Sequence, residues 1–533
     1  MKLALLFILL AAPTPARSSA PQDEPLTGIW EGRGKGSAPM IPPEGFGFSL
    51  RLEAKGDDEA LATLTMEGVP STAPVTASFD ADNGELVFRC DLLGILVDLE
   101  LELAGEELSG TAAGLGITVE LTGTRTSRTL PALAPPSAPR VRVDLTTLGA
   151  EAWREDLAFL AEALPKQHKN AFHTLTKEEW QQRVQALDAR LAELGPAASA
   201  LGLCQLVAAV GDAHTELALA GRPFDRFLPL QITWFEDGLF VTAVDERFEP
   251  VLGARVKRIG KASVEEAVAA VRTTFAAENE SWPRVKAPGK LAQPALLAAL
   301  GVTADENAIP LVVEGPGGED VALTIDGSGS GKWLIAPDQK LVPLPLWLQR
   351  FQETYWFAPI DEGRALYLAY NRCAEDPARP MQAFMAELLA ELEKPGVERL
   401  VIDLRHNSGG NSAVLATFVP GLGAHPRLAS PGSLRVLIGP RTYSSGMRNA
   451  YELRTQARAR LYGEPTGGKP NSYGELRVFT LPRSGLDVWH STKYFREMEP
   501  DGPAIEPDVR VPLTSADYFA GVDPVLERAL ATE

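Results

Sequence analysis

The sequence contains few cysteines: only Cys90, Cys204 and Cys373 occur in 533 residues. They are too widely spread for the paired spacing of a zinc site or for a disulfide-rich framework. A single disulfide would suit an oxidising compartment, but the spacing indicates no pair. We therefore expect small buried side chains at these positions, and we predict no metal and no other cofactor.

Long hydrophobic runs are also lacking, since no stretch approaches the roughly 20 apolar residues of a membrane-spanning helix. An apolar run from Leu3 to Ala12 follows Lys2 and precedes small residues that end at Ala20. This order is typical of a cleavable signal peptide over residues 1–20. We expect an exported, periplasmic or extracellular protein without a membrane span, and the sequence does not indicate its oligomeric state.

Positive charge is in deficit, with 51 Lys and Arg against 70 Asp and Glu and a formal net charge of −19. Nucleic-acid partners are not expected, because binding them requires clustered basic residues that neutralise phosphates. The hydrophobic content of 45% is ordinary for a globular protein. A chain of this length exceeds a single hydrophobic core and predicts several domains.

The N-terminal half changes its pattern twice. Short alternating runs separated by Gly, Asp and Asn turns predict a small antiparallel β-barrel or sandwich over residues 26–126. Residues 127–142 are rich in Pro and Ala and read as a linker. Residues 143–220 show apolar residues three and four apart, which predicts a helical segment.

The C-terminal half combines two further patterns. Residues 229–326 contain two strands around an Asp-Gly turn, a further strand and a helix, which indicates a compact mixed module. Residues 341–533 alternate strands with helices, which predicts a mainly parallel sheet with helices on its faces. Sites in such sheets form at the carboxyl ends of strands, where both RHNSGGN and RTYSSGM are expected.

The turn RTYSSGM offers a candidate nucleophile in Ser444 or Ser445. It lies between a strand and a helix, where orphan backbone N–H groups and the helix dipole favour negative charge. On the turn alone, helix capping by serine is the simpler explanation. Similarly, the paired glycines of RHNSGGN allow a close backbone approach, or belong to an ordinary strand-to-helix turn.

A serine nucleophile also needs a base, and two residues are candidates. Lys469, in GEPTGGK, serves only if desolvation makes it neutral near working pH, and most lysines in polar loops face solvent. His214, in GDAHTEL, titrates near neutrality without such tuning, although a histidine near a helix end commonly bonds locally.

Taken together, RLVIDLRHNSGGN, LIGPRTYSSGM, ARLYGEPTGGK and IEPDVRV resemble the C-terminal-processing, or tail-specific, serine peptidases. That family includes tricorn-like and interphotoreceptor retinoid-binding-protein-like relatives. The resemblance covers about residues 364–533, and GDAHTEL extends it upstream. It implies a multidomain α/β protein with a crotonase/ClpP-like ββα catalytic core, and a protein or peptide as substrate.

The resemblance assigns roles residue by residue. Ser444 matches the nucleophile, and the backbone N–H groups of Ser445 and of Gly409 or Gly410 match the oxyanion donors. Lys469 matches the base of the Ser-Lys branch, which the spacing favours. In the tricorn-like branch His214 is the base instead. The acids Glu464, Glu475 and Glu506 lie near these motifs, and none is assigned as an orienting partner.

One position departs from the family pattern, because Met447 stands where a glutamate is common. The first hypothesis is an exported serine endopeptidase that acts through an acyl-enzyme on Ser444. The alternative is a non-catalytic protein on the same fold that binds a peptide or a hydrophobic ligand, which Met447 favours. Residues 229–326 resemble the PDZ-like module of such peptidases, and modules of this kind bind chain ends at a sheet edge.

Overall fold

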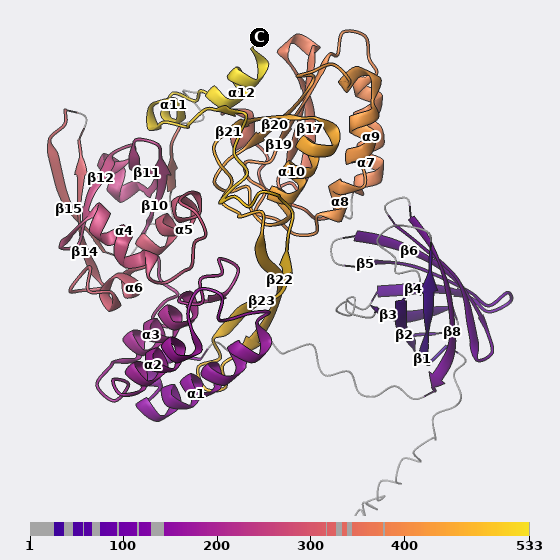
Figure 1. Ribbon diagram of the computed structural model, residues 1–533, viewed down its shortest axis with the longest axis horizontal. Coiled ribbons are helices and arrows are strands. Elements are labelled where there is room, and N and C mark those ends of the chain that lie inside the picture. The colour runs from indigo at the N-terminus through magenta and orange to yellow at the C-terminus, as the bar shows by residue number, and fades with distance from the viewer. Residues whose placement is uncertain are drawn as a thin grey trace, which may run out of the picture. The chain divides into compact units, whose positions relative to one another are not determined.

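The computed structural model describes residues 26–36, 46–56, 58–66, 75–92, 95–114, 117–128, 143–315, 317–326, 333–337, 344–376 and 379–531. The expected signal peptide and all but two residues of the expected linker lie outside these ranges. The chain divides into two compact units, Met1–Pro136 and Ser137–Glu533 (Figure 1). Among the described residues, no helix has the length and apolar character needed to cross a membrane.

The N-terminal unit is a closed antiparallel barrel in which each strand pairs with the next and the first pairs with the last. Its strands are β1 (Gly28–Lys35), β2 (Phe46–Ala54), β3 (Glu59–Met66), β4 (Val75–Asp80), β5 (Glu85–Leu92), β6 (Ile95–Ala104), β7 (Glu107–Gly114) and β8 (Ile117–Ser127). Alternate residues of β2, Phe48, Leu50 and Leu52, are buried beside Trp30. The predicted barrel is thereby confirmed, and the sandwich alternative is wrong.

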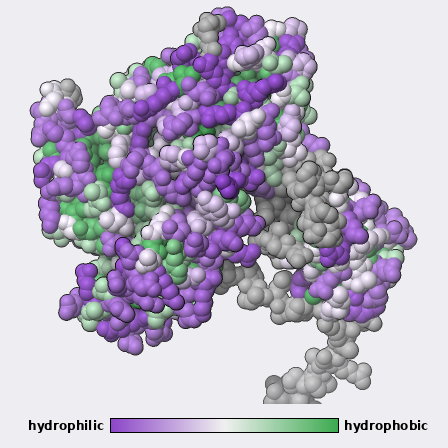
Figure 2. Space-filling model, in the orientation of Figure 1, coloured by the Kyte–Doolittle hydropathy of each residue, from purple (hydrophilic) through white to green (hydrophobic). Residues whose placement is uncertain are grey.

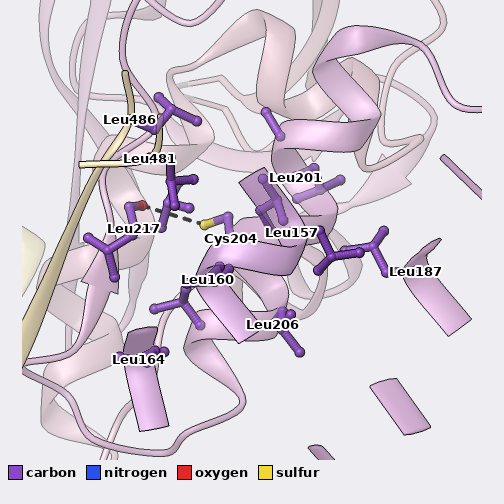
Figure 3. Packing of buried hydrophobic residues seen from close by; sticks show 14 of the residues in the cluster. Leu157, Leu160, Leu164, Leu187, Leu201, Cys204, Leu206, Leu217, Leu481 and Leu486 are labelled. Carbon is purple, nitrogen blue, oxygen red and sulfur yellow. Dashed lines mark hydrogen bonds between the residues drawn. The ribbon is translucent and has the colours of Figure 1, made fainter. Parts of the chain in front are cut away.

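The second unit begins with the predicted helical segment, which comprises α1 (Ala150–Gln167), α2 (Lys177–Asp188) and α3 (Pro196–Ala208). A capping box between Thr176 and Glu179 begins α2. The helices bury leucines against the hairpin of β22 (Ser472–Thr480) and β23 (Asp487–Phe495), as Figure 3 shows around Leu481 and Leu486. Residues far apart in the sequence therefore share this core.

The mixed module is built on an antiparallel sheet in the order β10-β11-β12-β14-β15. Its strands are β10 (Leu230–Phe235), β11 (Gly238–Asp245), β12 (Arg255–Ile259), β13 (Ala262–Ser263), β14 (Ala308–Glu314), β15 (Asp320–Asp326) and β16 (Trp333–Ile335), and its helices are α4 (Val264–Arg272), α5 (Ser281–Leu291) and α6 (Pro294–Ala299). A pocket of about 290 Å³ lies between α4 and β12. Hydrophobic residues gather on the visible face of this module (Figure 2).

The C-terminal part contains the predicted, mainly parallel sheet. Its order is β17 (Tyr355–Ile360), β18 (Ala365–Tyr370), β19 (Arg399–Asp403), β20 (Leu434–Ile438), β21 (Arg460–Gly463) and β24 (Val509–Arg510), and only β17 runs antiparallel to its neighbour. All residues of β18, β19 and β20 are buried, as expected for strands covered on both faces. This sheet places the turns after β19 and β20 at one edge.

The remaining elements connect and cover these sheets. The helices are α7 (Met381–Leu392), α8 (Ala413–Ala416), α9 (Val419–Ala424), α10 (Ser445–Ala457), α11 (Ser515–Phe519) and α12 (Pro524–Leu530). The 3-10 helices are η1 (Leu145–Thr147), η2 (Glu246–Val251), η3 (Leu346–Leu348), η4 (Asp361–Gly363) and η5 (Pro426–Leu428). A short strand, β9 (Glu216–Leu217), pairs with β23, so the GDAHTEL motif lies beside the hairpin. All three cysteines are buried, as expected.

Candidate active site

Ser444 lies in the turn between β20 and α10, with φ 50° and ψ −126°. It occupies the N-cap position, but its side chain makes no capping hydrogen bond. The capping explanation therefore does not account for this serine. A positive φ costs a residue with a Cβ about 1–3 kcal/mol, and the surrounding structure must hold it. Thr442 does so in part, because its hydroxyl donates to the Leu404 carbonyl over 2.9 Å.

The RHNSGGN turn packs directly against the serine turn. Tyr443 N–H donates to the Asn407 carbonyl over 3.0 Å, and the Ser445 hydroxyl donates to the Gly410 carbonyl over 2.7 Å. A Cβ on Gly409 would lie only 2.8 Å from the Ser444 Cβ, and Gly409 also has φ +113°. Glycine is therefore required at this position. The structure brings together the two turns that the strand order indicated.

The three predicted oxyanion donors differ in their hydrogen bonding. Gly409 N–H already donates to Asn407 Oδ1 over 3.0 Å. For the amides of Ser445 and Gly410, we find no acceptor among the described residues. The Ser445 amide also belongs to the first turn of α10, where intrahelical acceptors are lacking. Ser445 and Gly410 are therefore better placed than Gly409 to bind an oxyanion.

His214 is buried next to the serine turn, with a side chain only 7% exposed. Its Nδ1 lies 3.0 Å from the Tyr443 hydroxyl, and the two rings are 4.6 Å apart. Trp282 stacks on the Tyr443 ring, and the centroids of these two rings are 3.9 Å apart. Burial lowers the pKa of His214, which outweighs the opposing effect of Asp212. The imidazole is therefore neutral near pH 7.

Asp212 is the carboxylate beside His214, and it accepts several hydrogen bonds. Its donors are His168 Nε2 (3.0 Å), Thr215 Oγ1 (2.5 Å), Ser491 Oγ (2.6 Å) and the His214 amide (2.9 Å). Burial raises the pKa of Asp212, but these donors and His214 outweigh it and hold the pKa below its usual range. The sequence analysis missed this residue, although it belongs to the same GDAHTEL motif.

Glu278, between α4 and α5, is a second acid that the sequence analysis missed. Burial, together with the charge of Asp212, raises the pKa of Glu278 to about 8. The acids weighed from the sequence lie elsewhere: Glu464 pairs with Arg284 over 2.5 Å, and Glu475 lies 3.8 Å from Lys493. No local sequence signal distinguishes Glu278, since its burial arises from the packing of distant segments.

Lys469 reaches the same region by a different contact. Its loop lies against the serine turn, because a Cβ on Gly468 would be 3.2 Å from the Ser444 amide nitrogen. The Lys469 ammonium, however, is 3.1 Å from the Asp501 carboxylate. Within the described part of the chain, neither Lys469 nor His214 hydrogen-bonds to the Ser444 side chain. The choice between the two bases stays a prediction.

Met447 is buried in the first turns of α10 at 4% exposure. The position that commonly carries glutamate in the family is therefore part of an apolar core here. A glutamate would require a partner at this buried position.

A pocket of about 680 Å³ lies beside this site, between β10 and α5. β10 is the edge strand of its sheet, so one side of it has no strand partner among the described residues. Exposed Phe227 and Trp333 line the pocket together with Arg441, which belongs to the serine turn. Among the described residues, no carboxylate pairs with Arg441.

No protein-family model and no curated protein matches the chain. Solved structures do. Mature CPAF aligns with 14% identity over 71% of this chain and 96% of its own, with a TM-score of 0.49. The photosystem II D1 C-terminal processing protease aligns with 15% identity over 70% of this chain and 98% of its own, with a TM-score of 0.35. An Echinococcus granulosus fatty-acid-binding protein aligns with 12% identity over 19% of this chain and 98% of its own, with a TM-score of 0.15.

Proposed function

We propose that this protein is a serine peptidase that hydrolyses polypeptide chains through an acyl-enzyme on Ser444. One observation carries the proposal: Ser444 has a positive φ, its side chain makes no capping hydrogen bond, and it lies beside two backbone amides for which the described residues offer no acceptor. We further propose that the enzyme acts outside the cytoplasm, on the basis of the signal-peptide pattern over residues 1–20.

In the proposed reaction, Ser444 Oγ attacks the scissile carbonyl carbon while its proton passes to a base. The amides of Ser445 and Gly410 donate to the oxyanion that develops. Collapse of the tetrahedral intermediate breaks the C–N bond, and the base returns the proton to the leaving amine. Water then attacks the ester by the same route, which releases the acid and regenerates the Ser444 hydroxyl.

We assign the base to His214. A buried, neutral imidazole beside an ionised carboxylate suits general base catalysis near pH 7, whereas the Lys469 ammonium is engaged in an ion pair with Asp501. The reaction requires His214 and Ser444 Oγ to come within hydrogen-bonding distance. Catalytic hydrogen bonds are often long without substrate and tighten in the complex.

A covalent serine probe tests the proposal without requiring the substrate to be known. The full chain treated with a fluorophosphonate is expected to gain one label on the peptide that contains Ser444, as read by mass spectrometry. Ser444→Ala should lose the label and Ser445→Ala should keep it. Folded wild type that stays unlabelled would support the non-catalytic binding protein instead.

We also propose that the pocket between β10 and α5 binds the end of the substrate chain, as a PDZ-like module does. An extended peptide can add to the free edge of β10, and Arg441 offers a charge for the terminal carboxylate.

Arg441→Gln is therefore expected to raise KM for a peptide with a free C-terminus by about tenfold, which corresponds to the loss of one charge-assisted hydrogen bond. The KM of the same peptide with an amidated C-terminus should not change. Steady-state kinetics with both peptides measure the difference, and an equal effect on both would argue against carboxylate recognition.

A further inference from the structure

A second chemical feature overlaps the proposed site. Asp212, His214 and Glu278 each offer a ligand atom, and these three atoms all lie within 4.8 Å of one another. Asp212 and His214 belong to the loop after α3, and Glu278 comes from the segment between α4 and α5. Two packed segments, rather than one flexible loop, therefore hold the cluster.

Two polar atoms of these three residues lack partners. His214 Nε2 and Glu278 Oε2 are buried and have no hydrogen-bond partner among the described residues. The His214 side chain is only 7% exposed, and therefore 93% buried. Buried polar atoms are nearly always paired, so two exceptions of complementary chemistry on residues of one cluster indicate a missing ligand.

The chemistry of the cluster selects the class of ligand. One imidazole and two carboxylates bring a charge of −2 once Glu278 has released its proton, and a divalent cation balances that charge. Zn²⁺ accepts N and O ligands, and sites with three protein ligands keep a fourth position open. Hydrogen bonds from His168, Thr215 and Ser491 already orient Asp212, as outer-shell partners orient metal ligands.

We propose that Asp212, His214 and Glu278 bind Zn²⁺ and that the bound ion inhibits the peptidase. A metal bound to the imidazole occupies a lone pair that the base requires and holds the ring away from Ser444. The inhibitory role rests on the proposed function, whereas the binding site does not. Lys469 is a cation whose charge acts on Glu278, and its pairing with Asp501 leaves the carboxylates of the cluster to the metal.

The binding test uses Co²⁺ as a spectroscopic probe on the full chain after treatment with a chelator. We expect visible absorption from bound Co²⁺ that Zn²⁺ displaces at one ion per chain. Glu278→Gln should weaken Co²⁺ binding at least about tenfold, in line with the loss of a metal-site contact. Glu280→Gln is the matched control, because Glu280 is exposed and pairs with Arg272 at 3.0 Å. The affinity of this variant for Co²⁺ should equal that of wild type.

Circular dichroism checks that each variant is folded, and His214→Gln provides a second ligand variant if Glu278→Gln does not fold. Absence of Co²⁺ absorption in folded wild type would overturn the site, as would equal affinities in wild type and both ligand variants. Bound water at each of the two orphaned atoms would then explain them.

An activity arm separates the two proposals. Zn²⁺ is expected to abolish cleavage of unfolded protein in wild type, with recovery on adding chelator, and Glu278→Gln should need at least about tenfold more Zn²⁺. Binding of Co²⁺ without inhibition by Zn²⁺ would overturn the inhibitory role. Binding of Co²⁺ by a protein that neither cleaves nor takes the serine probe would overturn the proposed function and support the metal site.

Discussion

Alanine at Ser444 is expected to lower kcat for cleavage of unfolded protein by about 10⁴–10⁶-fold, and alanine at His214 by a similar factor. The two residues act as a unit, because the hydroxyl attacks only when the imidazole takes its proton. The measurement is steady-state cleavage of a fluorescently labelled unfolded protein by each variant, after circular dichroism has shown that the variant is folded.

Lys469→Ala is the comparison that identifies the base. We expect its kcat to stay within about tenfold of wild type, because a partly exposed ion pair such as that with Asp501 contributes little. His214→Gln serves as a second variant, since it keeps a polar side chain of similar size at the buried position. Full loss in Lys469→Ala with retained activity in His214→Gln would show a Ser-Lys dyad instead.

Replacing Arg405 with leucine is expected to destabilise the Ser137–Glu533 unit by about 3–5 kcal/mol. Arg405 follows β19 with a side chain only 10% exposed, and its guanidinium donates to Asp403 over 2.6 Å and to Asp523 over 2.8 Å. Removing it leaves two carboxylates buried without a cation, and Asp523 also begins α12 by capping. Urea denaturation of the full chain, followed by tryptophan fluorescence, measures the change in the free energy of unfolding.

Arg496→Leu is the control for this variant, because Arg496 is 73% exposed and pairs with the exposed Glu499. Its free energy of unfolding should change by less than about 0.5 kcal/mol. An equal change in the two variants would show that the buried ion pair does not stabilise the unit.

The same ion pair predicts a dependence on pH. Burial raises the pKa of Asp403, but Arg405 outweighs it and holds that pKa below its usual range. A lowered pKa in the folded state contributes stability above the unfolded value of about 3.9, and this contribution is lost as the pH falls through the folded value. The difference in stability between wild type and Arg405→Leu should therefore shrink on acidification below about pH 4.

The local features of this protein follow from its sequence. Alternating residues such as Phe48, Leu50 and Leu52 predict half-buried strands, and the mainly apolar sequences of β19 and β20 predict parallel strands covered on both faces. Because parallel strands end at the same edge, these sequences also indicate that the turns holding Gly409 and Ser444 lie together. The alternation of residues could not decide between a closed barrel and a sandwich, because closure depends on how strongly the whole sheet of eight strands twists and coils.

Only the tertiary structure decides which groups surround the proposed nucleophile. The contact between Asp212 and Ser491 joins residues 279 positions apart, and Glu278 is buried by segments with which it shares no pattern. Lys469 has the spacing of a base, but packing sets its ammonium beside Asp501. Sequence periodicity determines which faces are buried, whereas the charge state and orientation of a site depend on partners that meet only when distant segments pack.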